Sequence, residues 1–352
     1  MEKRYNSEIG ILRFVFASLI FLVHAFQVFH LPVFGDANYA VEFFFFLSGF
    51  YLAAHVIGKK KDGEDGGEAC RNYLSARFGK VFPILLAAIL YGLLADVIIS
   101  AGTFDKKSLL YIFNEIVPLQ GYGLPATTLT GVTWYLSVMF IGMALLYPVL
   151  YRWGSWFVKV YSVVIALILY GILAVVVGNL SAPGELVFFF LRGTVRGLGA
   201  MCIGCFIYGS MDRVERVPLL KSASVRLAVR VLCYALVITG MAFLNDSPYL
   251  FSLLPPYVAA VTLSLYRKDG EGRTRPGVER FARMLQEASL PMYLFHSRTV
   301  RLVEWASGSF LKALHDSPWG KTAVAFILSV AISILWLILE RSVKKALRKK
   351  SA

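Results

Sequence analysis

Two ionisable residues, Arg13 and His24, lie in the first strongly apolar stretch of the chain, ILRFVFASLIFLVHAFQVF. A charged side chain inside a membrane helix costs about 2.5–3.5 kcal/mol on the lenient insertion scales, so such residues usually have a function. Ten residues separate the two, which places them about 16 Å apart along a helix axis, roughly half of a bilayer core. The spacing predicts a cation near one membrane face and a titratable base about halfway across.

Other ionisable residues fall inside or at the ends of later apolar stretches and are further candidates for chemistry. They are Glu42, Arg77, Lys80, Arg192, Arg196, His296, Arg298 and Arg301. Histidine is the usual general base near neutral pH, and the guanidinium fork of arginine matches phosphate oxygens. Such a set suits the transfer of an acyl group from a phosphorylated cytosolic donor to an acceptor within or beyond the membrane. The alternative is that these residues pair with one another and hold a helix bundle together.

Several other kinds of site are disfavoured. The chain has no glycine-rich phosphate loop, no zinc-ligand cluster and no HExxH motif. Ser48 and Ser137 have no base at close helical spacing, which argues against a serine nucleophile. Cys202-x-x-Cys205 lacks a second Cys or His pair and stands among small residues, GLGAMCIGCFIYG, which indicates a helix-packing face. We therefore expect no metal site.

The elements that position these residues are membrane helices. The chain has 352 residues, of which 57% are hydrophobic, and a mean hydropathy of +0.64, whereas soluble domains are about 45–50% apolar. We expect an all-α polytopic membrane protein with about ten transmembrane helices, near 10–29, 37–57, 80–101, 132–151, 157–178, 185–209, 227–245, 249–266, 286–306 and 320–341.

These helices are expected to form a single transmembrane domain over residues 1–352, with helices over about 10–341 and a basic cytoplasmic tail at 342–352. The first apolar stretch carries Arg13 and lacks a small-residue cleavage site. It is therefore predicted to be a retained helix rather than a cleaved signal peptide.

Lysine and arginine concentrate in one alternate set of loops and in both termini, and are sparse in the other set. By the positive-inside rule both termini are cytoplasmic, in a multi-pass protein of the inner (cytoplasmic) membrane. The same alternation accounts for the net charge of +14, so we expect a lipid bilayer and no nucleic acid as partner. Segment 59–70 is predicted to be a mobile cytoplasmic loop. The outer connection 102–131 either covers an acceptor site or is a plain connector.

Six short motifs follow one another along these expected helices. They are Arg13-x10-His24, Glu42-Phe-Phe-Phe-Phe-Leu-Ser-Gly-Phe50, Arg77-Phe-Gly-Lys80-Val-Phe-Pro83, Thr133-Trp-Tyr-Leu-Ser137, the glycine-rich run from Arg196 to Gly204, and Leu290-Pro-Met-Tyr-Leu-Phe-His296. This ordered set resembles the membrane-bound acyltransferase 3 family, the transmembrane O-acyltransferases of bacterial glycans, over about residues 8–341.

The chain departs from the family pattern at several places, including Pro291 before His296 and Arg298 and Arg301 after it. Two further departures concern the proposed catalytic and donor residues. Lys80 replaces the second arginine of the third-helix motif, which keeps the charge but loses the bidentate fork. Val138 and Met139 stand where many members carry a glutamate in the fourth helix. That absence leaves Glu42 as the expected orienter of His24.

The resemblance implies a reaction and its substrates. The donor would be acetyl-CoA or another short acyl-CoA, taken from the cytoplasm as a co-substrate, with no permanently bound cofactor. The acceptor would be a hydroxyl of a cell-surface or lipid-linked glycan, so the reaction would be an O-acetylation that modifies the bacterial cell envelope.

The resemblance also implies roles for the matching residues. His24 would act as general base, and Glu42 would orient it or hold its charge. Arg13, Arg77 and Lys80 would bind the phosphates of CoA. Candidates for the acceptor site or acyl channel are Trp134, Tyr135, Phe43–Phe46, Arg192, Arg196, His296 and Arg298. For the aromatic residues, plain packing is the alternative.

Two other functions fit the same features. Ten helices with buried histidine and arginine also suit a proton-coupled secondary transporter or a lipid or glycan flippase. No paired discontinuous helices and no related halves are evident in the sequence. A sensor or structural membrane protein would keep the fold without catalysis. An acyltransferase consumes the thioester of its acyl-CoA donor, whereas a carrier moves solute without consuming it, so an assay of thioester loss distinguishes the two.

Overall fold

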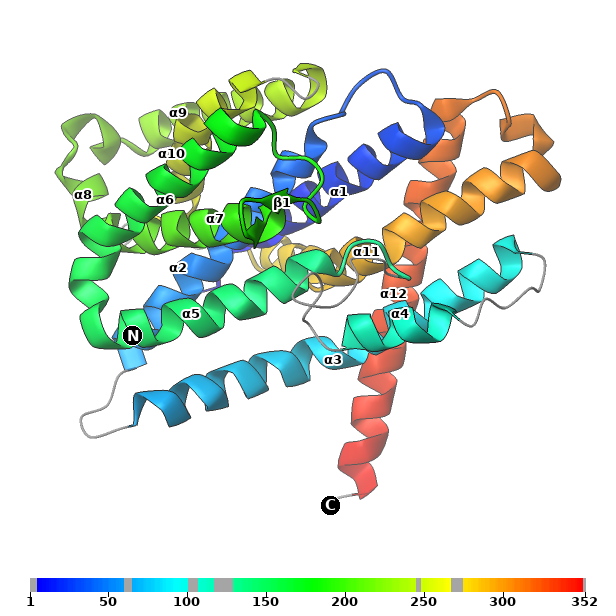
Figure 1. The fold of residues 1–352 in the computed structure, drawn as a ribbon, viewed down its shortest axis with the longest axis horizontal. Coiled ribbons are helices and arrows are strands. Elements are labelled where there is room, and N and C mark those ends of the chain that lie inside the picture. Colours follow the sequence, from blue (N-terminus) through cyan, green and yellow to red (C-terminus); the bar gives the residue numbers. More distant parts are fainter. Residues whose placement is uncertain are drawn as a thin grey trace.

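Helices dominate the computed structural model, which describes residues 5–59, 65–100, 107–116, 129–244, 248–266 and 275–350 (Figure 1). Within these residues the strands are confined to one antiparallel hairpin, β1 (Leu186–Val187) and β2 (Phe190–Leu191). Phe188 in its turn has a φ of 55°, in the left-handed region that tight hairpin turns use.

The α-helices of the described residues follow the apolar stretches of the sequence. They are α1 (Ser7–Phe29), α2 (Val41–Lys59), α3 (Gly66–Ile99), α4 (Lys107–Ile116), α5 (Trp134–Trp156), α6 (Ser162–Ile172), α7 (Arg192–Gly209), α8 (Met211–Arg216), α9 (Ala223–Phe243), α10 (Leu254–Leu265), α11 (Pro276–Ser309) and α12 (Pro318–Lys350). Short π-helical turns flank α6, and short 3-10 turns precede α2 and α10.

Seven segments of the described chain are long and apolar enough to cross a membrane. They are Ser7–Phe29, Ala37–Lys59, Gly66–Ile99, Trp134–Val177, Ala223–Phe243, Pro248–Leu265 and Pro318–Leu347. The expected fold class, an all-α polytopic membrane protein, is confirmed. The count of about ten spans and the cytoplasmic position of both termini stay predictions.

The third expected helix begins earlier than its hydropathy indicates. The structure starts α3 at Gly66 rather than near residue 80, because Asp65 caps it. The Asp65 carboxylate accepts hydrogen bonds from the backbone N–H groups of Gly67 (3.2 Å) and Glu68 (3.1 Å), as an N-cap does. The segment 59–70 is therefore helical from residue 66, and its residues 60–64 lie outside the described part of the chain.

Other boundaries move for local reasons. The α11 helix begins at Pro276, where proline suits the first helical turn, rather than near 286. The helix expected over 185–209 begins only at Arg192, because the hairpin β1–β2 precedes it. In the expected outer connection 102–131, α4 and residues 129–131 are described and the rest is not. At the other end, α12 continues through most of the expected tail 342–352.

Helices α2 and α7 cross at very close range, which confirms the small-residue packing face expected around Cys202 and Cys205. A Cβ on Gly49 would overlap the backbone carbonyl of Met201, and a Cβ on Gly204 would overlap that of Phe46. Cys202 and Cys205 are buried and unbridged, and the thiol of Cys205 lies 3.5 Å from the carbonyl oxygen of Gly49. Small residues at a membrane-helix crossing allow backbones to approach this closely.

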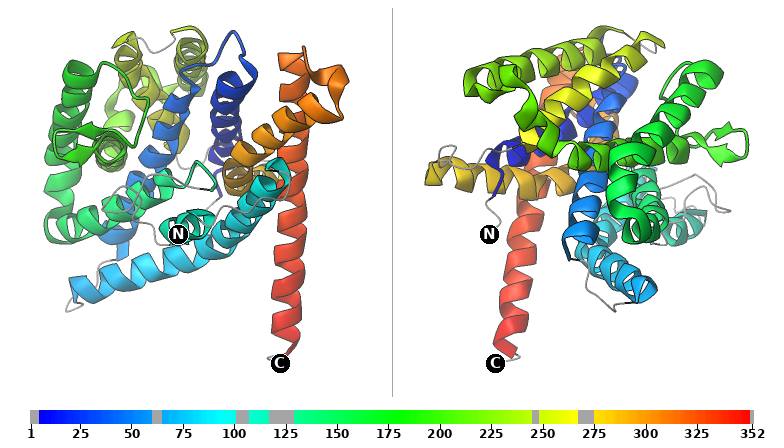
Figure 2. Two further views of the ribbon diagram at one scale, coloured as in Figure 1. Left: turned by 45° about the vertical axis from the view of Figure 1, so that its right-hand side comes forward. Right: turned by 90° about the vertical axis from the view of Figure 1, so that its left-hand side faces the viewer.

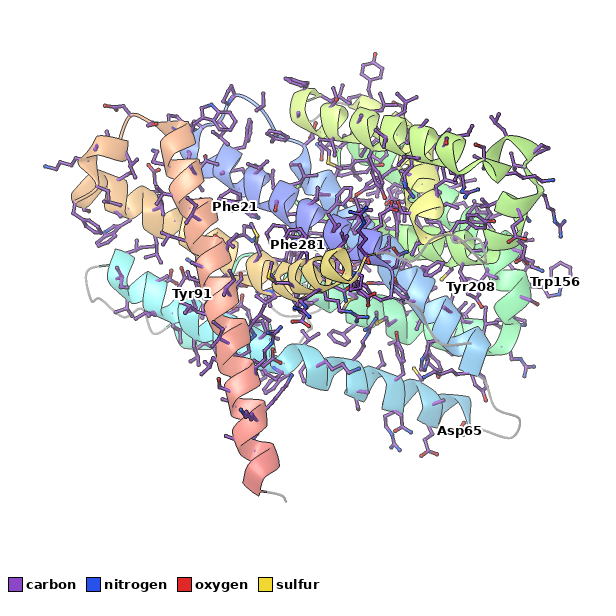
Figure 3. The ribbon with its side chains drawn as sticks, turned by 180° about the vertical axis from the view of Figure 1, so that it is seen from behind. Phe21, Asp65, Tyr91, Trp156, Tyr208 and Phe281 are labelled. Atoms are coloured by element: carbon purple, nitrogen blue, oxygen red, sulfur yellow. The ribbon has the colours of Figure 1, made fainter. Side chains whose placement is uncertain are left out.

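Helix α1 packs along α11, and α11 in turn packs on α12. Phe21 of α1 lies among these three helices (Figure 3), with its ring edge-on to His296 at 6.2 Å and to Phe326 at 5.4 Å between centroids. The C-terminal end of α12 extends beyond the other helices (Figure 2). The packing of α1 on α11 fixes the rotation of α1 about its axis, and therefore the direction in which Arg13 and His24 point.

Candidate functional site

A wide cavity lies where α1 begins and α2 ends, with α3 and α5 completing its wall. Its volume is about 1040 Å³. Four cations line it, Lys59 from the end of α2, Arg13 from α1, and Arg77 and Lys80 from α3. The fold thus brings together the three residues that the sequence assigned to donor phosphates.

Arg13, Arg77 and Lys80 differ from Arg192, Arg196 and Arg298 in having no acidic partner among the described residues. Among the described residues no carboxylate forms an ion pair with Arg13, Arg77 or Lys80. The guanidinium of Arg13 lies over the Tyr51 ring at 5.8 Å, that of Arg77 lies over Tyr73 at 5.9 Å, and Arg13 Nε is buried without a hydrogen bond. The buried Nε of Arg13 is costly to leave without a partner, and Arg77 and the exposed Lys80 add positive charge beside it, so the cavity suits an anionic ligand.

A second, narrower cavity of about 160 Å³ shares Arg13, Tyr51, Arg77 and Lys80 with the first. The cations therefore stand where the two cavities meet. The inner cavity is otherwise lined by apolar side chains and a few hydroxyls, from Val41, Phe44, Leu47, Ser48, Val81, Tyr135, Leu136, Met139, Ser289, Leu290 and Tyr293. This wall suits a slender chain that carries few charges of its own.

Two tyrosines of the inner cavity connect it to His296. The rings of Tyr135 and Tyr293 lie 5.7 Å apart, and Tyr293 lies 5.9 Å from the imidazole of His296. The Tyr293 hydroxyl donates a 2.6 Å hydrogen bond to the carbonyl oxygen of Val132, which holds the ring in place. Tyr135, expected in the channel, does line the inner cavity, and Tyr293 is a lining residue that the sequence did not single out.

His24 lies beyond these tyrosines, on the same face of α1 as Arg13. The eleven-residue step from Arg13 to His24 is about three full turns of helix, so both side chains point in nearly the same direction. His24 is half-buried and meets His296, with 4.9 Å between ring centroids. His296 itself is 0% exposed. Neither cavity includes His24 among its described lining residues.

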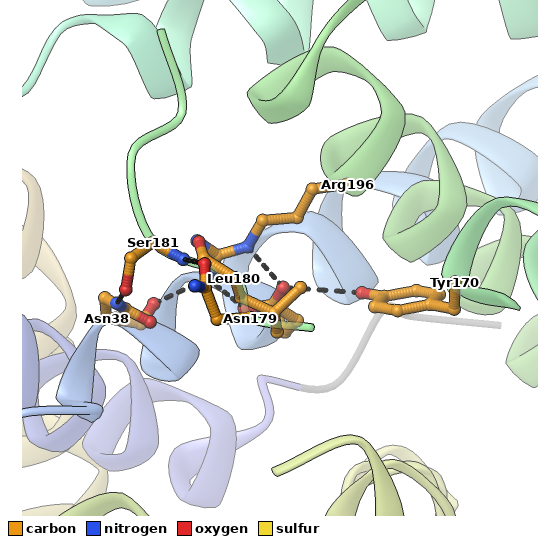
Figure 4. Close-up of polar contacts among 7 residues, drawn as sticks. Asn38, Tyr170, Asn179, Leu180, Ser181 and Arg196 are labelled. Atoms are coloured by element: carbon orange, nitrogen blue, oxygen red, sulfur yellow. Dashed lines mark hydrogen bonds and ion pairs between the residues drawn. The ribbon is translucent and has the colours of Figure 1, made fainter. Parts of the chain in front are cut away.

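Glu42 has a different partner from the one expected. Its carboxylate accepts hydrogen bonds from Arg196 Nε and Nη2, each at 2.5 Å, and from the Tyr170 hydroxyl at 3.4 Å (Figure 4). Arg196 also donates to the backbone carbonyls of Asn38 and Leu180. Among the described residues no hydrogen bond or ion pair joins Glu42 to His24. Glu42 and Arg196 instead form a closed, fully buried pair that joins α2 to α7.

Arg192 and Arg298, also expected near an acceptor or channel, are both engaged in ion pairs. Arg192 binds Glu185 at 2.5 Å and the carbonyl of Ser181 at 2.6 Å, which fastens the hairpin segment to the start of α7. Arg298 binds Asp96 of α3 at 2.5 Å. It also donates a hydrogen bond to the carbonyl of Leu129. These contacts give both arginines a role in holding segments together.

Comparison with known families decides the class of this protein. The model of an acyltransferase domain matches residues 6–338, nearly the whole chain. The chain belongs to the acyltransferase 3 family. No curated protein and no solved structure gave a match. Membership makes this polytopic membrane protein an acyltransferase and covers every site residue described above.

Val138 and Met139, the two residues that stand in place of the expected glutamate, have different surroundings in this acyltransferase. A Cβ on Gly197 would overlap a methyl group of Val138, so α5 and α7 touch at this point. Met139 lines the inner cavity. The neighbouring Trp134, expected in the channel, instead lies 5.9 Å from the Arg196 guanidinium. Of the run Phe43–Phe46, only Phe44 lines the inner cavity, and the other three are fully buried core residues.

Some residues of the acyltransferase site were missed by sequence reasoning. Tyr147 and Tyr151 line the wide cavity with nearly parallel rings 6.4 Å apart, and their four-residue spacing at the end of α5 was the available signal.

Outside the two cavities, Glu115 of α4 is a buried carboxylate that sequence reasoning also missed. It accepts hydrogen bonds from the backbone N–H and hydroxyl of Thr130 and from Thr133. Burial raises the pKa of the Glu115 carboxyl. It lies in a polar connector, where sequence gives no sign of burial.

Proposed function

We propose that this protein transfers an acetyl or other short acyl group from cytoplasmic acyl-CoA to a hydroxyl of a cell-surface or lipid-linked glycan. The observation that carries the proposal is a set of three cations, Arg13, Arg77 and Lys80, that meet no carboxylate in the described part of the chain and lie where a wide and a narrow cavity join. Lys59 lines the wide cavity on the lysine-rich side of the bundle, and the positive-inside rule makes this side cytoplasmic. In the proposed location, the bacterial cytoplasmic membrane, the cavity therefore opens toward a cytosolic donor.

The wide cavity is the proposed site of the nucleotide end of the donor. Arg13, Arg77 and Lys80 bind its phosphates, which supply the anionic partner that these cations lack. The aromatic rings of Tyr73, Tyr147 and Tyr151 line the same space and offer flat faces to the base. Family membership supports this assignment, since an acyltransferase needs an activated donor.

The inner cavity is the proposed site of the thioester arm and the acyl group. Its small volume and largely apolar wall favour a short acyl chain over a long one. Tyr135 and Tyr293 at its far side separate this arm from His24 and His296. The acyl carbon therefore has to advance past these two rings to meet the acceptor.

His24 is the proposed general base. The acceptor hydroxyl oxygen attacks the thioester carbonyl carbon as its proton passes to a ring nitrogen of His24. The carbon–sulfur bond then breaks, and the leaving CoA sulfur receives that proton. The products are the O-acyl glycan and free CoA thiol, and His24 is returned to its neutral form.

The test is a transfer assay with purified protein in nanodiscs, labelled acetyl-CoA and a glycan-bearing membrane extract. We expect label in the glycan and one equivalent of free CoA thiol for each acetyl group transferred. His24→Ala in the same nanodiscs is the control for background acetylation. Movement of solute across proteoliposomes without loss of thioester would instead identify a carrier and contradict the proposal.

A further inference from the structure

The imidazole of His296 has one nitrogen that is buried and unsatisfied. Its Nε2 has no hydrogen-bond partner among the described residues, although the side chain is 0% exposed. A buried polar atom left without a partner destabilises the fold, because it has lost its hydrogen bonds to water. An acyltransferase that keeps such an atom beside its general base has a use for it, and the surroundings indicate which use.

The other nitrogen of His296 decides what Nε2 can do. Nδ1 lies 2.7 Å from the backbone carbonyl oxygen of Tyr293 and 3.2 Å from that of Met292. A carbonyl oxygen only accepts hydrogen bonds, so Nδ1 carries the proton. In the neutral ring Nε2 then presents a lone pair, and this nitrogen is a hydrogen-bond acceptor waiting for a donor.

Among the described residues three aromatic rings, those of Phe21, His24 and Tyr293, neighbour the His296 ring, and His24 is the one that brings a ring N–H. Phe21 offers only carbon, and the hydroxyl of Tyr293 is committed to the Val132 carbonyl. His24 lies at 4.9 Å between centroids, with the two imidazole planes tilted by 58°. At this separation the two rings are direct neighbours, and a change of side-chain rotamer can turn an N–H of His24 toward Nε2 of His296.

We propose that His296 is a positioning residue whose Nε2 accepts a hydrogen bond from one ring nitrogen of His24. This contact leaves the other nitrogen of His24 with its lone pair directed to the acceptor hydroxyl. The inference rests on the proposed function, because it assumes that His24 takes the acceptor's proton. When that proton arrives, the His24 ring carries one positive charge and both of its nitrogens bear a proton. His296 stabilises this charged form through the same hydrogen bond.

The first test compares His296→Leu with His296→Gln in the transfer assay. Leucine removes the acceptor, so turnover falls on the order of 10- to 100-fold with an unchanged KM for acyl-CoA. Glutamine keeps an acceptor oxygen and recovers much of the loss. Val300→Ala, a fully buried position one turn further along α11, is the matched control for general loosening of this helix. Equal losses of turnover in His296→Leu and Val300→Ala would show that His296 contributes only packing and would overturn the inference.

The second test asks whether His296 acts through His24. In a His24→Ala background, adding His296→Leu should leave the residual rate unchanged, because a positioning residue has nothing left to position. A further loss in that background, or His296→Gln as inactive as His24→Ala, would make His296 a base in its own right and overturn the inference. Nitrogen-15 NMR of histidine-labelled protein should show one His24 tautomer in the wild type and a mixture in His296→Leu.

These outcomes separate the inference from the proposed function. If wild-type protein transfers no acyl group, the proposed function fails. If the wild type transfers and His24→Ala does not, while His296→Leu is as active as the wild type with an unaltered His24 tautomer, only the inference fails.

Discussion

Glu42 and Arg196 form a two-point ion pair at 2.5 Å in which the two side chains are 0% and 1% exposed. The partners lie 154 residues apart in the sequence and join α2 to α7. Arg196 also donates to the backbone carbonyls of Asn38 and Leu180, and the Tyr170 hydroxyl donates to the Glu42 carboxylate (Figure 4). Such a pair holds the fold in one arrangement and leaves neither charge free for chemistry.

Removing one partner of this pair should unfold the protein rather than merely slow it. We expect Glu42→Ala to lose about 3–5 kcal/mol, because a buried guanidinium is left without its counter-charge. The double variant Glu42→Leu with Arg196→Met should recover much of the lost stability, because it removes both charges and leaves no unpaired charge in the core. Thermal melting in detergent measures this. A Glu42→Ala protein that melts like the wild type yet transfers no acyl group would place Glu42 in the chemistry instead.

His24→Ala should abolish acyl transfer with little loss of folded protein. General-base catalysis contributes about 10²–10⁴ in rate, and His24 is only half-buried, so its removal leaves a modest void. Size-exclusion chromatography confirms folding, and the labelled-acetyl assay measures turnover. His30→Ala, just beyond the end of α1 and exposed, is the control histidine. Normal glycan acetylation by His24→Ala would end the general-base role.

Arg13→Ala should weaken use of the donor more than use of the acceptor. A charge-assisted hydrogen bond is worth about 1.5–3 kcal/mol, which corresponds to a rise of about 10- to 100-fold in the KM for acyl-CoA. The KM for the glycan acceptor should stay within about twofold. Arg152→Ala, an exposed arginine at the end of α5, serves as the control for lost charge. An unchanged dependence of rate on acyl-CoA concentration would count against the donor site.

Met139→Ala should widen the inner cavity and shift the preference toward longer acyl groups. Met139 lines that cavity from α5, and each methylene that a pocket admits or rejects changes selectivity by about 1–3 kcal/mol. We expect the ratio of kcat/KM for hexanoyl-CoA over acetyl-CoA to rise by about 10-fold or more. Leu145→Ala removes a side chain that is 53% exposed on the same helix and should leave the ratio unchanged. A constant ratio in Met139→Ala would place the acyl group elsewhere.

Gly49→Val should disrupt the crossing of α2 and α7. Even a Cβ at this position overlaps the Met201 backbone, so the helices must separate, at a cost of at least about 1–3 kcal/mol. Gly58→Ala on the same helix meets nothing within 4 Å and should be neutral or slightly stabilising, because alanine favours helix. Melting temperature and yield of monodisperse protein measure both variants. Equal stability of Gly49→Val and wild type would show that the crossing is looser than described.

Much of the fold follows from local sequence. Long apolar stretches with few breaks favour helices whatever their neighbours do, and the expected helices all have counterparts among the described residues. The boundaries were less predictable. Asp65 starts α3 within a charged segment that hydropathy assigns to a loop, and the hairpin before Arg192 lies within an apolar stretch that hydropathy assigns to a helix.

The sequence by itself determined that Arg13 and His24 share one helix at a fixed separation, because helical rise and twist depend only on the number of residues between them. It also placed the chain in its family. Only the tertiary structure decided the partners: Glu42 with Arg196, His24 with His296, and for Arg13 the Tyr51 ring but no carboxylate among the described residues. Partners across helices depend on how each helix is rotated about its axis, and that rotation is fixed by packing over the whole bundle.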